Sequence, residues 1–154
     1  MFYFAEIEFD NKNIHKSTFQ KMTAQVMASK RVMYKTEFIF RASPTIVYQF
    51  LSSPACLVRW FCDEVDISAN VYTFSWDGDE QVATLIEDWE DELLRFEWED
   101  APSPSEYLEF TIVKSPITEE TVLTITDFCD ANEVKEAQKL WDSQIAQMRV
   151  ETGG

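Results

Sequence analysis

The strongest constraint on the fold is a succession of five short segments, between residues 71 and 128, in which apolar and polar side chains alternate. Alternation with a period of two is typical of β-strands that bury one face. Turn residues separate the segments, and Asp77-Gly78 is the clearest hairpin signal among them. The sequence therefore predicts an antiparallel meander with strands at 71–76, 81–89, 93–99, 107–114 and 121–128.

Two short helices are expected between a first strand and this meander. Ser43-Pro44 and Ser53-Pro54 each place a capping hydroxyl before a proline, which is the residue favoured at the first helical position. The elements predicted ahead of the meander are a strand at 32–41, helices at 44–51 and 54–61, and a brief extended piece at 65–67.

The chain closes with a long amphipathic helix, predicted at 131–150. Asp130 is expected to cap it, with Glu133 three residues on as an acidic variant of the capping box. Apolar residues spaced three or four apart form one stripe, which consists of Val134, Ala137, Trp141, Ile145 and Met148. Because this stripe needs an apolar surface, we expect an α+β fold in which the sheet curls around the helix.

The composition argues against several kinds of function. Gly78 is the only glycine before the terminal pair, so the chain has no glycine-rich phosphate-binding loop. His15 is the single histidine, which disfavours Ser-His-Asp catalysis and histidine-based metal sites. A formal net charge of −15 would repel nucleic acid and anionic membranes. We therefore expect no catalytic residue, no metal and no cofactor, and rank a cyclase or hydrolase last.

The cysteines and the N-terminal residues bear on the cellular setting. Cys56, Cys62 and Cys129 contain no C-x-x-C pair and leave an odd thiol, which fits a reducing compartment. The chain has no apolar stretch of about 18 residues and no signal-peptide pattern at its start, so we expect a cytoplasmic protein. Residues 1–30 differ in composition from the rest and are expected to be an appendage to a domain at 31–152.

Five segments of the sequence also resemble those of a known family. They are FIFRASPTIVYQFLSSPACLVRWF in the first strand and helix pair, YTFSWDG and LLRFEWED in the sheet, and VLTITDF and LWDSQIAQMR in the last strand and helix. Over residues 32–150 the chain resembles the START-like superfamily of polyketide-cyclase-like and lipid-transport proteins (SRPBCC), and within it relatives of the activator of the heat-shock-chaperone ATPase. The resemblance implies a helix-grip fold: a curved antiparallel sheet of about seven strands around a long C-terminal helix, with two short helices after the first strand.

Two positions depart from the pattern of that family. Many relatives of the chaperone activator carry a glycine pair before the third strand and a histidine in the last strand, where this chain reads Ser68-Ala69-Asn70 and Thr126-Asp127. The departure argues against an activity that depends on that histidine. Because the superfamily spans lipid carriers, cyclases and co-chaperone-like modules, the resemblance by itself leaves the function open.

The aromatic side chains of the predicted strands share the inward-facing parity and would face the helical stripe. They form either an ordinary packed core or the wall of an apolar cavity, and the volume between sheet and helix distinguishes the two. Asp127 has the same parity, so desolvation would raise its pKa; it would act as an acid, anchor a ligand or cap a neighbouring turn. The candidate ligand-binding residues are Phe38, Phe40, Tyr72, Phe74, Trp76, Phe96, Trp98, Phe110, Asp127, Trp141, Ile145 and Met148.

Two functions remain after these exclusions. The first is non-enzymatic binding of a small hydrophobic or amphipathic ligand, such as a lipid, in a cavity of roughly a few hundred Å³ between sheet and helix. The second is a co-chaperone-like protein-interaction module that presents its acidic surface to a basic partner in a salt-sensitive complex. We favour the first.

Overall fold

The computed structural model describes residues 30–154. The proposed appendage at 1–30 therefore lies, apart from Lys30, outside the described residues. Within the described range, no helix is both long enough and apolar enough to cross a membrane.

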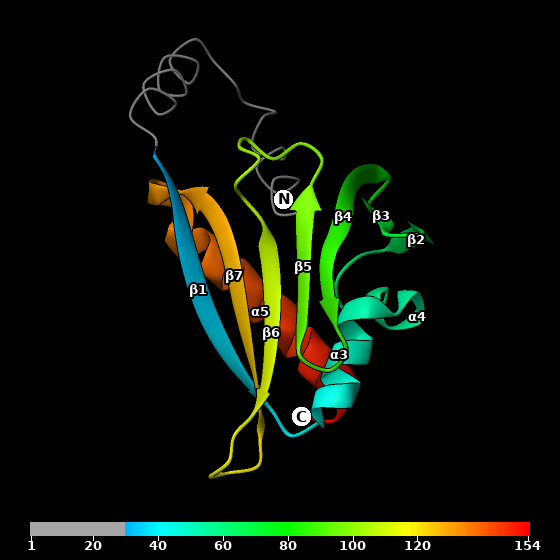
Figure 1. The fold of residues 1–154 in the computed structure, drawn as a ribbon, viewed down its shortest axis with the longest axis vertical. Coiled ribbons are helices and arrows are strands. Elements are labelled where there is room, and N and C mark those ends of the chain that lie inside the picture. The colour runs from blue at the N-terminus through cyan, green and yellow to red at the C-terminus, as the bar shows by residue number, and fades with distance from the viewer. Residues whose placement is uncertain (1–29) are drawn as a thin grey trace.

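A seven-stranded antiparallel sheet forms the body of the domain, in the order β1-β7-β6-β5-β4-β3-β2 (Figure 1). Its strands are β1 (Arg31–Phe40), β2 (Glu64–Ser68), β3 (Val71–Trp76), β4 (Asp79–Trp89), β5 (Leu93–Trp98), β6 (Leu108–Lys114) and β7 (Thr121–Asp130). The helices are α3 (Pro44–Ser52), α4 (Pro54–Leu57), a 3-10 turn η2 (Ala131–Glu133) and α5 (Val134–Thr152). The expected α+β helix-grip fold is confirmed.

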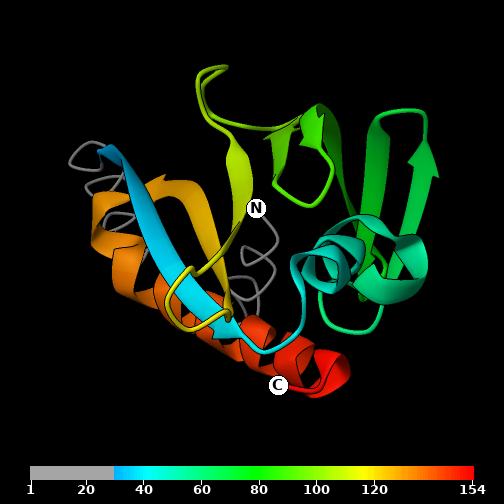
Figure 2. The same cartoon turned by 60° about the horizontal axis from the view of Figure 1, so that its bottom comes forward.

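The sheet is strongly curved. Figure 2 shows β1 and β7 with α5 on one side of the molecule, and β2 and β3 with α3 and α4 on the other. A bulge interrupts the pairing of β4 with β5 between Leu85 and Glu87, and bulges of this kind bend a strand and increase its twist. The predicted Asp77-Gly78 hairpin joins β3 to β4, with φ of 53° and 88°, as a type I′ turn requires.

The apolar stripe of α5 packs against the concave face of the sheet. Trp141, Ile145 and Met148 are completely buried, and Ala137 is nearly so. The helix ends where Gly153 adopts a left-handed conformation with φ of 88° and donates its backbone N–H to the Arg149 carbonyl. Val134, at the start of the helix, is only partly buried and packs at the edge of the core.

Two of the predicted helix caps, Asp130 and Ser53, occupy an N-cap position but lack the capping side-chain hydrogen bond. Asp130 makes no capping hydrogen bond; instead its carboxylate accepts a hydrogen bond from Arg31 at 3.2 Å, and the η2 turn precedes α5. Ser43 caps α3 as expected, but the Ser53 hydroxyl makes no capping bond to α4. The helix α4 is also shorter than predicted, because hydrogen-bonded turns replace it after Leu57.

We expect Ile145→Ala to lower the free energy of unfolding by about 2–5 kcal/mol, because it opens a cavity under a completely buried part of α5. The matched control is Val150→Ala on the same helix, where the side chain is 74% exposed. The control should change the stability by no more than about 0.5 kcal/mol. Urea denaturation of both variants measures the difference, and equal effects would contradict the packing of α5 described here.

Candidate functional site

The predicted aromatic residues lie together on the concave side of the sheet, but one is less enclosed than expected. Phe74 is the centre of the group, with its ring centroid 5.8 Å from those of Tyr72 and Trp98. The Phe110 ring meets Trp141 of α5 edge-on at 5.9 Å. Trp76 is only partly buried, and its indole N–H donates to the Phe61 carbonyl at 2.6 Å. The remaining members of the predicted set are buried: Phe38, Phe40, Phe96, Ile145 and Met148.

The space among these rings is almost filled in this structure. The cavity that remains there has a volume of about 10 Å³, about what a single water molecule needs. It is lined by Leu51, Leu57, Trp60, Phe61, Phe74, Phe96, Trp98, Leu108 and Phe110. A ligand of many atoms therefore enters this region only if the side chains that line the cavity move apart.

Asp127 is the one ionisable group of the predicted set, and β7 places it inside the domain. Strand parity predicts this position, since Leu123 and Ile125 on the same face are completely buried and Asp127 is 2% exposed. Its carboxylate accepts hydrogen bonds from the Tyr34 hydroxyl at 3.2 Å and from the backbone N–H of Phe128 at 2.8 Å. These bonds hold the carboxyl group in one orientation at the end of β7.

The hydrogen bonds around Asp127 continue into α5. The indole N–H of Trp141 donates to the Tyr34 hydroxyl oxygen at 3.1 Å. Since an indole N–H can only donate, the Tyr34 oxygen accepts the hydrogen bond from Trp141, and the Tyr34 O–H donates one to Asp127. Burial raises the pKa of Asp127 to about 7, although its hydrogen bonds favour the charged form. Burial and the nearby Asp127 raise the pKa of Tyr34 as well, so Tyr34 stays protonated.

A small polar pocket adjoins Asp127 beneath the loop between β5 and β6. Its volume is about 60 Å³, enough for a few water molecules. The residues that line it are Trp98, Asp100, Ala101, Pro102, Glu106, Tyr107, Asp127 and Phe128. Within the described residues, no group of three or more His, Cys, Asp and Glu side chains is arranged to hold a metal ion.

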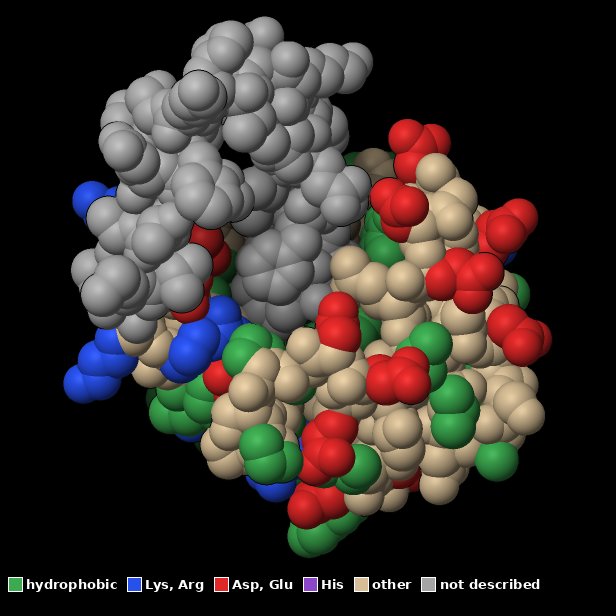
Figure 3. Space-filling model, turned by 90° about the horizontal axis from the view of Figure 1, so that it is seen from above, with side chains coloured by type: hydrophobic (Ala, Val, Ile, Leu, Met, Phe, Trp, Pro, Cys, Tyr) green, Lys and Arg blue, Asp and Glu red, His purple; other side chains and the backbone are tan. Residues whose placement is uncertain are grey.

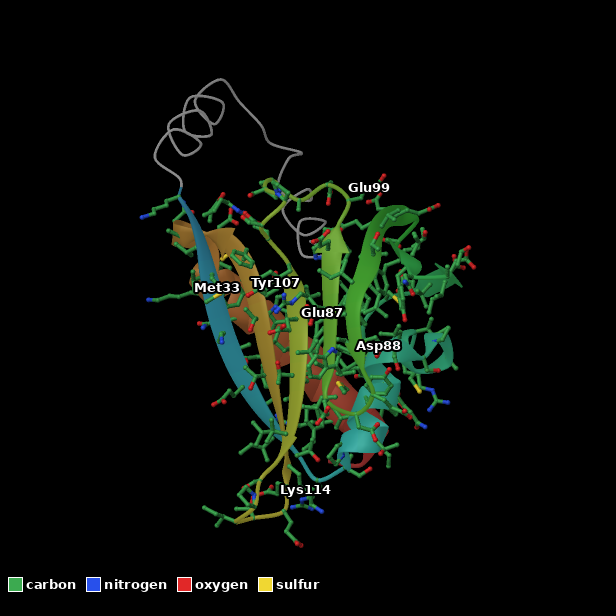
Figure 4. The ribbon with its side chains drawn as sticks, in the orientation of Figure 1. Met33, Glu87, Asp88, Glu99, Tyr107 and Lys114 are labelled. Carbon is green, nitrogen blue, oxygen red and sulfur yellow. The ribbon has the colours of Figure 1, made fainter. Side chains whose placement is uncertain are left out.

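A larger groove opens to the surface on the other side of the same loop. Its volume is about 510 Å³, and Glu97 and Glu99 contribute exposed carboxylates to it. Figure 4 shows Glu99 where β5 passes into the loop, at the upper end of the sheet. Apolar parts of the wall come from Val71, Val82 and Trp98. Trp98 thus borders the groove, the polar pocket and the apolar cavity.

The predicted site lacked three residues of this region: Glu106, its partner Arg31, and Tyr34. Glu106 is 7% exposed although it lies in a loop, and both of its oxygens accept from the Arg31 guanidinium, at 2.6 and 3.0 Å. Its burial has no signal in the sequence, because it depends on a partner 75 positions away. Tyr34 could have been found, since it shares the inward parity of Phe38 and Phe40.

Tyr107 and Phe128, which also line the polar pocket, form part of a cluster on the outer face of the same region. Tyr107 packs edge-on against Phe128 at 5.2 Å, and the Arg95 guanidinium lies 4.3 Å above its ring centre. The Tyr107 hydroxyl also approaches the Met33 sulfur at 3.9 Å, and Figure 4 shows both side chains on this side of the sheet. This cluster covers the outside of β7, the strand that carries Asp127.

Asp127→Asn should flatten the dependence of stability on pH between about 4 and 7. In that window the folded protein holds a proton that the unfolded chain, with an aspartate pKa of 3.8, has released. The free energy of unfolding of the wild type therefore falls as the pH rises and levels off above 7, and this group contributes a decrease on the order of 4 kcal/mol. Asp142→Asn, an exposed site on α5, makes the same change in net charge and should keep the wild-type slope. Denaturation at several pH values tests this, and parallel curves for wild type and Asp127→Asn would contradict it.

The fold and the sequence both match known proteins. A sequence profile of the START-like superfamily domain matches residues 27–153. A Bacteroides fragilis protein solved by NMR is 30% identical, with a TM-score of 0.59 over 79% of this chain and 91% of that one. The search of curated proteins found no match.

Two further solved structures share the fold at lower identity. The Aha1 dimer from Colwellia psychrerythraea is 12% identical, with a TM-score of 0.67 over 79% of this chain and 96% of that one. DynU16, a protein encoded in the dynemicin biosynthetic locus, is 19% identical, with a TM-score of 0.66 over 79% of this chain and 48% of that one. With the profile match over nearly the whole described range, they lead to one conclusion: the chain belongs to the START-like superfamily.

Proposed function

We propose that the protein binds one small hydrophobic or amphipathic molecule, such as a lipid, between the curved sheet and α5, without transforming it. The observation that carries this proposal is the position of Trp98. This side chain, 6% exposed, forms a wall of the surface groove, the polar pocket and the apolar cavity. A movement of one ring would therefore join a groove of about 510 Å³ to the interior.

The chemistry of the three hollows changes from the surface inward. The groove has exposed carboxylates, the pocket has buried polar groups, and the apolar cavity is walled by leucine and aromatic side chains. An amphipathic molecule fits this order with its polar end beside Asp127 and its apolar part among the rings of Phe74, Phe96 and Phe110. Ligand entry must be coupled to an opening of the core, since the volume of the apolar cavity in this structure is only about 10 Å³.

We propose no chemical step for the bound molecule. The described residues bring no histidine to the site, and the two buried thiols are poor nucleophiles. Burial raises the pKa of Cys62 to about 12 and that of Cys129 to about 11, so both remain protonated. With three free cysteines in the described range, we also propose that the protein works in the reducing cytoplasm.

The small volume of the apolar cavity favours a second candidate function, a protein-interaction module. A filled core is what such a module requires, and the charge of −15 suits a basic partner. Figure 3 shows acidic side chains spread over the described part of the face that it views. Attraction through exposed carboxylates weakens as salt is added, so this function would appear as a complex that dissociates at high ionic strength.

Native mass spectrometry of protein purified gently from its host, with a solvent extract of the same sample, distinguishes the two functions. Ligand binding predicts a stoichiometric added mass that leaves on denaturation and is recovered in the extract. A polypeptide mass with no added small molecule would contradict ligand binding. If a basic protein also co-purifies at low salt and is lost at high salt, the result would support the interaction module.

Trp98→Ala should weaken the binding of prodan, a neutral hydrophobic fluorescent probe, by about tenfold, because it removes an aromatic wall common to all three hollows. Trp89→Ala is the matched control, as this side chain is 59% exposed and lines none of the three hollows described. Fluorescence titration measures both, with circular dichroism to verify the fold. The opposite pattern, in which only Trp89→Ala weakens binding, would place the probe on the surface.

A further inference from the structure

Trp98, which lines the polar pocket, has a side-chain hydrogen-bond donor without a partner among the described residues. The indole nitrogen of Trp98 is buried and has no hydrogen-bond partner among the described residues. A buried donor that lacks an acceptor costs roughly 1–3 kcal/mol, so most such groups in native proteins are bonded to protein, water or ligand. Trp60, by contrast, donates its indole N–H to the Phe50 carbonyl at 2.7 Å. The unused N–H of Trp98 therefore points to an acceptor that the pocket receives from outside.

The two buried carboxylates of the pocket, Glu106 and Asp127, already accept hydrogen bonds from the protein. Glu106 is held by Arg31 through two hydrogen bonds, and Asp127 accepts from Tyr34 and from the backbone of Phe128. A carboxylate has about four lone-pair positions, so both groups retain acceptor capacity. The residues that line the pocket thus include one side-chain donor without a partner among the described residues, beside carboxylates that retain acceptor capacity, and no Lys or Arg.

This combination discriminates among ligand end groups. A carboxylate or phosphate would satisfy Trp98 but would lie against Glu106 and Asp127, and like charges at close range cost several kcal/mol. An ammonium group satisfies the carboxylates but has no lone pair for the indole N–H. A hydroxyl group accepts from Trp98 and donates to a carboxylate at the same time, and it replaces a water molecule that would make the same two bonds.

We propose that the pocket bounded by Trp98, Glu106 and Asp127 selects a neutral, hydroxyl-bearing end of the ligand, and that anionic amphiphiles such as fatty acids are excluded. This inference rests on the proposed ligand-binding function and narrows it to uncharged alcohols. The volume of about 60 Å³ admits a hydroxyl group with its adjoining carbons, while the rest of the molecule extends past Trp98.

The test compares three eight-carbon probes by titration calorimetry at pH 8, where Asp127 is ionised: 1-octanol, its isomer heptyl methyl ether, and octanoate. We expect the ether, which accepts but cannot donate, to bind roughly 3–10-fold more weakly than octanol. Octanoate should bind at least about 30-fold more weakly than octanol. Octanoate that binds as tightly as octanol would overturn the inference and leave the proposed function standing.

Trp98→Phe provides a second test, since it removes the N–H and keeps an aromatic ring. It should weaken octanol binding about 5–10-fold. Trp89→Phe makes the same substitution at a side chain that is 59% exposed and lines none of the three hollows, so it should change octanol binding by less than about twofold. Equal octanol affinity in wild type and folded Trp98→Phe would overturn the inference. Failure of all three probes to bind the wild type would instead reject the proposed function.

Discussion

The upper end of the domain depends on one buried chain of hydrogen bonds, from Trp141 through Tyr34 to Asp127. It joins β1 to β7 and to α5, through hydrogen bonds between residues 93 and 107 positions apart in the sequence. A carboxyl group that is 2% exposed is costly unless donors surround it, and this chain supplies them. The interior of the domain therefore has a polar end with fixed geometry and an apolar remainder.

These two parts of the interior suggest how one fold can hold an amphipathic molecule. The polar end is rigid, because each hydrogen bond has a defined donor and acceptor. The apolar remainder is made of aromatic rings that contact one another mostly edge-on or tilted, with little free volume. Trp98 lies at the boundary, so the side chain that closes the interior also presents the unused donor of the polar pocket.

Most of the fold follows from periodicity in the sequence. Alternation placed Phe40, Leu123 and Asp127 on the inner face, and the helical stripe placed Trp141 in the core, because local backbone geometry determines which side chains share a face. The register of β1 with β7 is different, since it joins residues about 80 to 100 positions apart. For the same reason, the sequence does not reveal that the Asp130 carboxylate pairs with Arg31 instead of capping the helix with its side chain.

The volume of the interior cavity could not be predicted from the sequence. Inward parity identifies which residues could line a cavity, but it says nothing of how closely their rings approach. The burial of Glu106 was equally hidden, because a glutamate in a loop beside two prolines is ordinarily exposed, and only the two hydrogen bonds from Arg31 keep it inside. Both features depend on tertiary contacts, and both shape the candidate site.

The most direct test of this account is the indole N–H signal of Trp98 in a proton–nitrogen NMR spectrum during titration with 1-octanol. If the ligand's hydroxyl group accepts from Trp98, this signal should move downfield and saturate at one equivalent, while that of Trp60, already bonded to a backbone carbonyl, should move much less. A Trp98 signal that stays in place while the exposed Trp89 responds would show that octanol binds outside, and would contradict the account.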